Sequence, residues 1–142
     1  MIRFFIALSV SAGAMSLGAA PTHAQSADAG QAVFKHDCAI CHDVVPDKNR
    51  IGPSLFGIAG RNAGTVPNFH YSDGNKKSGL AWDTATLDRY LANPRGMVAG
   101  TTMSYGGVKD DQKRRDLIAY TSRPYRRLVC AQGWRGGCAR NQ

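Results

Sequence analysis

Apolar residues recur at helical spacing in three segments of the chain, separated by long polar stretches. The first segment covers residues 27–37, where one apolar stripe predicts an amphipathic helix. The stripe consists of Ala29, Val33 and Phe34. Ser26 or Asp28 can accept a hydrogen bond from the free N–H groups at its start.

A second helix is predicted over residues 83–93, with Leu87, Tyr90 and Leu91 on one face. Asp83 is a suitable N-cap. Pro94 should end the helix, because the residue before a proline avoids the helical conformation.

A third helix should begin at Asp110 or Asp111 and stop near Arg123, ahead of Pro124. Its apolar positions include Leu117, Ile118 and Tyr120.

Between residues 43 and 75 the chain is rich in Gly, Pro, Asn and Asp, which indicates turns and loops. Such a long irregular stretch is unusual in a compact domain unless a bound group organises it. No internal repeat and no alternating strand pattern is visible. The fold class predicted is all-α, with three main helices and long loops.

The two ends of the chain differ from this central part. Residues 1–24 begin with a positive charge and continue as an uncharged run of apolar and small residues, which is typical of a cleaved signal peptide. The run is short for a transmembrane anchor. We therefore expect export to a bacterial periplasm and a mature domain over residues 25–123.

The basic charge of the chain, +8 overall, is concentrated in its last residues. Five arginines and no acidic residue lie between Thr121 and Gln142. Residues 124–142 are predicted to be a basic, disordered tail, either appended with a Cys130–Cys138 disulfide or produced by a shifted reading frame. No nucleic-acid-binding motif accompanies these arginines, so no nucleic-acid partner is predicted.

The motif Cys38-Ala39-Ile40-Cys41-His42 carries the most specific chemistry. This spacing is typical of covalent c-type haem attachment, with the histidine as an iron ligand. A zinc site would need further ligands, and a thioredoxin-like dithiol would need a βαβ pattern, and neither is present. One covalent haem c is therefore the predicted cofactor.

The second axial ligand is less clear from the residues alone. Met97, Met103 and His70 are candidates. Gly100 and Gly106 flank Met103 and would let its loop approach a flat ring, whereas Met97 is expected to pack in the core.

Several separated motifs together resemble the class I c-type cytochromes over about residues 28–121. The motifs are Gly30 and Phe34, Cys38 to His42, Gly52-Pro53-x-Leu55-x-Gly57, Gly60-Arg61, Phe69-x-Tyr71-Ser72-Asp73, Trp82, Tyr90-Leu91-x-Asn93-Pro94, Gly100-Thr101-x-Met103 and Asp116 to Tyr120. The resemblance implies the cytochrome c fold wrapped around one haem.

The resemblance also implies a role for each matching residue. Cys38 and Cys41 would form thioether bonds, His42 would be the proximal ligand oriented by the Pro53 carbonyl, and Met103 would be the distal ligand. Positions near the haem propionates are matched by Arg61, Tyr71 and Trp82. Polar positions near the methionine are matched by Asn75, Tyr90 and Thr101. The first and last helices would cross where Gly30 and Phe34 meet Leu117 and Tyr120.

Two departures from the family pattern concern function. Ala99 replaces the usual proline before Gly-Thr, so the methionine loop is expected to be looser. Asp37, Asp110 and Asp111 stand where the family places lysines around the exposed haem edge, which weakens the case for a strongly acidic partner.

The function implied is that of a monomeric, soluble electron carrier and not of an enzyme. Its partners would be membrane complexes, such as a bc-type complex and a terminal oxidase or photosynthetic reaction centre. Two alternatives stay open. An open iron site could reduce peroxide if Met103 dissociates, and the shortened last helix could leave the product poorly folded.

Overall fold

The structure is a computed structural model that describes residues 25–123. The predicted signal peptide and the predicted tail, with Cys130 and Cys138, lie outside these residues. Five α-helices and one π-helical turn are present in the described part: α1 Ala27–Val33, η1 Phe34–Cys38, α2 Asp73–Lys77, α3 Thr84–Ala92, α4 Pro94–Met97 and α5 Asp111–Thr121. The only β-pairing there is an isolated bridge between Asn62 and Ala81. Among these helices, none has the length and hydropathy to cross a bilayer.

The first helix begins as predicted but changes its pitch before it ends. The Ser26 hydroxyl accepts a hydrogen bond of 3.2 Å from the Ala29 N–H and caps α1. From Phe34 the chain widens into the π-turn, closed by the Ala39 N–H donating to the Phe34 carbonyl at 2.9 Å. The prediction of one helix to residue 37 was therefore wrong in this respect, because apolar spacing does not distinguish α- from π-pairing.

The second predicted helix is confirmed as α3, capped by Asp83, whose carboxylate accepts from the Thr86 N–H at 2.7 Å. The helix ends at Ala92, so the predicted end before Pro94 is confirmed, and Pro94 itself does not lie in a loop. It is the first residue of α4, a position where the backbone N–H makes no hydrogen bond within the helix, so a proline costs nothing there. The Asn93 side chain caps this helix by accepting a hydrogen bond from the Gly96 N–H.

The third predicted helix is confirmed as α5. Asp110, one of the two cap candidates, accepts a hydrogen bond of 2.9 Å from the Lys113 N–H. The helix ends at Thr121, two residues before the expected stop, and Pro124 lies outside the described residues.

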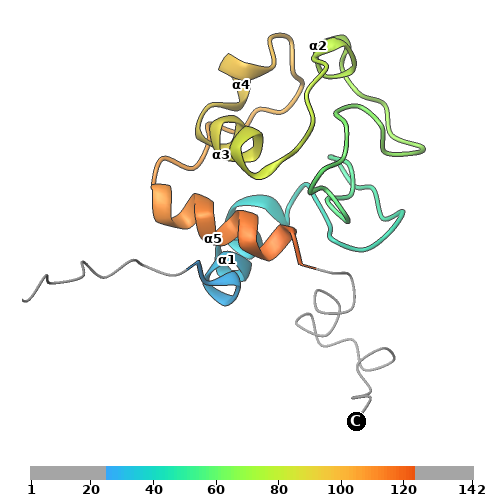
Figure 1. Ribbon diagram of the computed structural model, residues 1–142. Helices are drawn as coiled ribbons and strands as arrows, with labels where there is room; N and C mark the ends of the chain where they lie inside the picture. Colours follow the sequence, from blue (N-terminus) through green and yellow to red (C-terminus); the bar gives the residue numbers. More distant parts are fainter. Residues whose placement is uncertain (1–24, 124–142) are drawn as a thin grey trace, which may run out of the picture.

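The crossing of α1 and α5 forms the base of the molecule (Figure 1). A Cβ atom on Gly30 would meet the Asp116 carbonyl and lie 2.9 Å from the Leu117 nitrogen, so only glycine allows this approach. The rings of Phe34 and Tyr120 lie 5.5 Å apart. The expected crossing of the terminal helices is thus confirmed.

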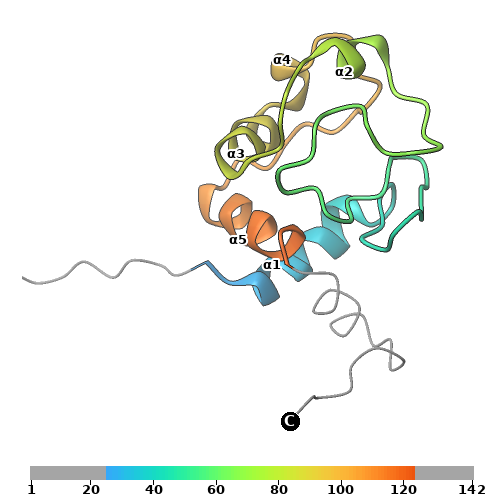
Figure 2. The same ribbon diagram turned by 45° about the vertical axis from the view of Figure 1, so that its right-hand side comes forward.

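The remaining segments stand above this base. The α3–α4 pair rises on one side and the long loop between η1 and α2 forms the other (Figures 1 and 2). Two groups of buried side chains line the interior. The first contains Phe34, Cys38, Val44, Val108, Leu117 and Tyr120. The second contains Ile58, Trp82, Leu87 and Ile118. Segments from both sides surround a central cavity.

Candidate haem site

A cavity of about 400 Å³ lies between the long loop, α2, α3 and the segment after α4. Its volume is in the range of ordinary cofactor pockets, and its walls are mainly apolar. The structure brings all eleven predicted site residues to this one cavity. They are Cys38, Cys41, His42, Pro53, Arg61, Tyr71, Asn75, Trp82, Tyr90, Thr101 and Met103.

The two cysteines belong to the turn that follows the π-helical segment. The Cys41 and His42 N–H groups both donate to the Cys38 carbonyl, at 3.0 and 2.8 Å. Both thiols are free. Burial, with smaller contributions from the charges of Asp37 and Cys41, raises the pKa of Cys38 to about 12. This thiol is therefore protonated and unlike the activated thiolate of a redox dithiol.

The imidazole of His42 is held in one orientation. Its Nδ1 donates a hydrogen bond of 2.7 Å to the Pro53 carbonyl, which leaves Nε2 as the unprotonated nitrogen. Burial lowers the pKa of His42, although the bond to Pro53 opposes this effect. A neutral imidazole with a fixed tautomer is the form that binds a metal. Gly52 leaves room for the ring, because a Cβ there would lie 2.7 Å from Nδ1.

Met103 lines the same cavity from the loop between α4 and α5. The Tyr90 hydroxyl donates to the Met103 sulfur at 3.7 Å. Burial raises the pKa of Tyr90, and a hydrogen bond with Thr101 partly offsets this. The Met103 N–H donates to the Thr101 hydroxyl at 3.2 Å. Two of the three polar residues predicted near the methionine, Tyr90 and Thr101, therefore contact it, and the third, Asn75, lines the same cavity.

The two competing ligand candidates lie elsewhere. His70 is exposed, and neither it nor Met97 belongs to the cavity lining. The expected burial of Met97 in the core is only partly correct. Met97 is half-buried, whereas its neighbour Val98 is 1% exposed and fills the core position.

Polar groups on the cavity wall are held by the backbone or lack a partner. Two nitrogens of Arg61 donate to the Phe56 and Ser54 carbonyls, at 2.7 and 3.1 Å, and burial lowers the pKa of Arg61. The Asn75 side-chain oxygen is buried and has no hydrogen-bond partner in the described part of the chain. A buried polar atom without a partner is unusual and fits a site that receives a further group.

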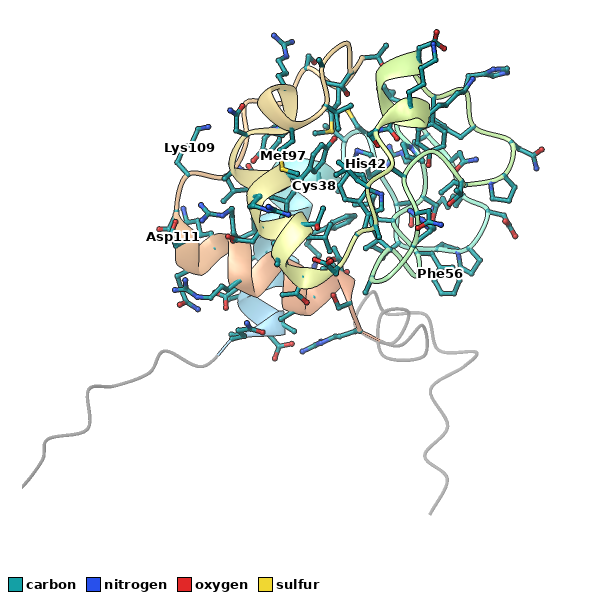
Figure 3. All side chains as sticks on the ribbon, turned by 45° about the horizontal axis from the view of Figure 1, so that its top comes forward. Cys38, His42, Phe56, Met97, Lys109 and Asp111 are labelled. Atoms are coloured by element: carbon teal, nitrogen blue, oxygen red, sulfur yellow. The ribbon has the colours of Figure 1, made fainter. Side chains whose placement is uncertain are left out.

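The donor set as a whole fits a haem. Two thiols three residues apart, a neutral imidazole and a thioether share one apolar cavity, which has a guanidinium and amide groups on its wall. Cys38 and His42 lie in the centre of the molecule, whereas Phe56, Lys109 and Asp111 are at its periphery (Figure 3).

Sequence reasoning did not place two isoleucines at the cavity. Ile40 and Ile51 line it but are 73% and 77% exposed, and no periodic signal marks them because both lie in turns. Asp37, which bonds His36 at 2.6 Å, also contacts Tyr105. Burial first, and then the Asp37 charge, raises the pKa of Tyr105 to about 12.

Comparisons with known proteins gave matches that span most of the described residues. A protein family described as "Cytochrome C oxidase, cbb3-type, subunit III" matches residues 25–120. Cytochrome c2 of Blastochloris viridis is 45% identical over 107 residues, covering 75% of this chain and 84% of that protein. Cytochrome c of Gibberella zeae is 47% identical over 92 residues, covering 64% and 87%. The solved structure of cytochrome cH from Methylobacterium extorquens is similar, with a TM-score of 0.64 and 42% identity, covering 68% of this chain and 96% of that one.

Proposed function

Because this chain belongs to the class I c-type cytochromes and carries covalently bound haem c, we propose that it shuttles single electrons in the bacterial periplasm. Its partners would be membrane-bound respiratory or photosynthetic complexes, such as a bc-type complex and a terminal oxidase or reaction centre. The observation that carries the proposal is the meeting of two free thiols, one oriented imidazole and one thioether in a single cavity.

The residues that would hold the group are assigned by their chemistry. Cys38 and Cys41 would form the thioether bonds, Nε2 of His42 would be the proximal ligand and the sulfur of Met103 the distal ligand. Bound haem supplies a one-electron ferrous/ferric couple. A neutral thioether favours the ferrous state, so ligation by His42 and Met103 would give the haem a raised reduction potential.

The other site residues act on these ligands and on the water around them. The Pro53 carbonyl keeps His42 in one tautomer. The Tyr90 hydroxyl withdraws electron density from the Met103 sulfur. Arg61, Tyr71 and Trp82 are the proposed neighbours of the propionates, and Asn75 and Thr101 supply polarity near the methionine. The apolar walls exclude water, which keeps the charge rearrangement during electron transfer small.

The periplasmic location depends on the predicted signal peptide, which lies outside the described residues. It is supported by the relationship to bacterial cytochromes c2. Fusion of residues 1–24 to a reporter that is active only after export would test it.

Visible spectroscopy and voltammetry of the purified holoprotein test the ligand assignment. Met103→Ala should remove the weak long-wavelength band of sulfur ligation from the oxidised spectrum and lower the reduction potential. Met97→Ala is the matched control, since Met97 does not line the cavity, and should retain both properties. An unchanged spectrum and potential in Met103→Ala would contradict the proposal. Rapid cyanide binding by the unmodified protein would instead favour the peroxide-reducing alternative.

A further inference from the structure

A close backbone contact joins α2 to the loop that carries Met103. A Cβ atom on Gly74 would collide with the carbonyl oxygen of Ala99 and would lie 3.1 Å from its carbon and 3.3 Å from the carbonyl carbon of Gly100. These distances are too short for a real side chain to occupy without movement of one partner. The loop therefore rests on a part of α2 where only glycine leaves room.

The loop has little freedom to move at this contact. Val98 is 1% exposed, and its carbonyl accepts a hydrogen bond of 3.2 Å from the Thr101 N–H, which closes a turn. Gly100, inside this turn, has a φ of +74°. Thr101 in turn accepts a hydrogen bond from the Met103 N–H. A displacement of the Ala99 carbonyl would thus be passed to Met103 through this turn and through the bond to the Thr101 hydroxyl.

On its other side, α2 is held in place by the loop that precedes it. A Cβ on Gly64 would lie 3.1 Å from the Cα of Lys76, so α2 is also closely packed against the preceding loop. Ser72 caps its start by accepting from the Asn75 N–H at 3.2 Å. Both ribbon views place α2 beside the chain that follows α4 (Figures 1 and 2).

From these contacts we infer that Gly74 is a positioning residue for the distal ligand. Because Gly74 has no side chain, the Ala99 carbonyl can pack directly against α2. This contact holds Met103 at the distance from which its sulfur binds the iron. The inference rests on the proposed role of Met103. The sequence predicted a looser loop because Ala99 replaces a proline. In this inference, packing of the loop on α2 supplies the restraint that a proline ring would give.

Gly74→Ala tests the inference in the purified holoprotein. Alanine is a better helix former than glycine, so the substitution favours α2 itself while displacing the loop. Cyanide competes with the methionine for ferric iron, and its affinity should rise by about tenfold, the effect of one misplaced methyl group in a packed site. The sulfur band should weaken and the reduction potential should fall. Lys77→Ala is the matched control, because it also places an alanine in α2, at a side chain that is 79% exposed.

Two further measurements separate ligand positioning from general damage. Loss of methionine ligation should lower the melting temperature of the ferric form more than that of the ferrous form, whereas a packing defect lowers both equally. Ala99→Gly adds backbone freedom without adding atoms, and should raise the cyanide affinity in the same direction by a smaller factor.

Each outcome bears on a different claim. A sulfur band absent from the unmodified protein would refute Met103 as the ligand and the inference with it. A band present there and equally strong in Gly74→Ala, Ala99→Gly and Lys77→Ala would refute the inference alone. If Gly74→Ala gives no folded holoprotein, an unchanged cyanide affinity in Ala99→Gly would still overturn it.

Discussion

Arg114 at the start of α5 connects that helix with α3 and with the chain returning from the methionine loop. Its guanidinium donates to the Asp88 carboxylate at 2.9 Å and to the Asp111 carboxylate at 2.6 Å. It also donates to the carbonyls of Val108 and Lys109, at 3.0 and 3.1 Å. The Arg114 side chain is only 10% exposed. We predict that Arg114→Leu destabilises the protein mainly through the buried carbonyl of Val108.

The size of the effect follows from the exposure of each partner. Asp88 and Asp111 are 41% and 70% exposed, so each ion pair contributes about 0–1 kcal/mol. Val108 is 5% exposed, and its carbonyl would lose its donor at a cost of about 1–3 kcal/mol. Water can replace the bond to exposed Lys109. The expected loss in the free energy of unfolding is about 1–5 kcal/mol.

Urea unfolding of the holoprotein, followed by circular dichroism, measures this loss. A domain of this size should also melt at least about 4 °C lower. Arg114→Lys keeps the charge but cannot reach all four acceptors, so it should resemble Arg114→Leu. Asp88→Asn should cost less than about 1 kcal/mol. If Asp88→Asn reproduced the whole effect, or if Arg114→Leu had none, the reasoning from the carbonyls would be refuted.

Three other predictions concern the helices and the methionine. Gly30→Ala should lower the free energy of unfolding by about 1–3 kcal/mol, because the methyl group meets the backbone of α5, and an unchanged melting temperature would contradict this. Hydrogen bonds from first-turn N–H groups lower the pKa values of Asp83 and Asp110 below 3.8. Their stabilisation is present above pH 3.8 and is lost as the pH falls through the lower folded pKa values, so replacing both by asparagine should flatten the acid dependence of thermal melts. A melt that is equally acid-sensitive in that double variant would refute the assignment. Tyr90→Phe should lower the reduction potential by about 20–60 mV through the lost bond to Met103, and voltammetry showing a rise would oppose it.

Predictions from the sequence succeeded where the deciding contacts are local. The caps of α1, α3 and α5 could be predicted because a capping bond joins residues three apart, as between Asp83 and Thr86. The haem-attachment motif is local for the same reason, since a single turn brings Cys38, Cys41 and His42 together. The end of α5 was predicted only to within two residues, because the proline signal acts on one neighbour only and the helix stops before reaching it.

Predictions were incomplete where packing decides the conformation. α2 and α4 carry no distinctive apolar period, so nothing in the sequence alone marked them, and the helix predicted over residues 27–37 gave no sign of its change to π-pairing. Which of two methionines lines the cavity could be inferred from family resemblance but not from spacing. The position of the loop that carries Met103 depends on contacts with Tyr90 and with α2, which are distant from it in the chain.

The amino-acid sequence by itself determined the attachment motif, the three main helices with their caps and the all-α class. Each of these depends on residues within one or two turns of chain, whose relative positions the backbone geometry limits strongly. The tertiary structure alone decided the π-turn, the enclosure of the cavity and the contact between Gly74 and Ala99. Those features arise where segments far apart in sequence compete for the same space, and only their mutual packing determines which backbone approaches which.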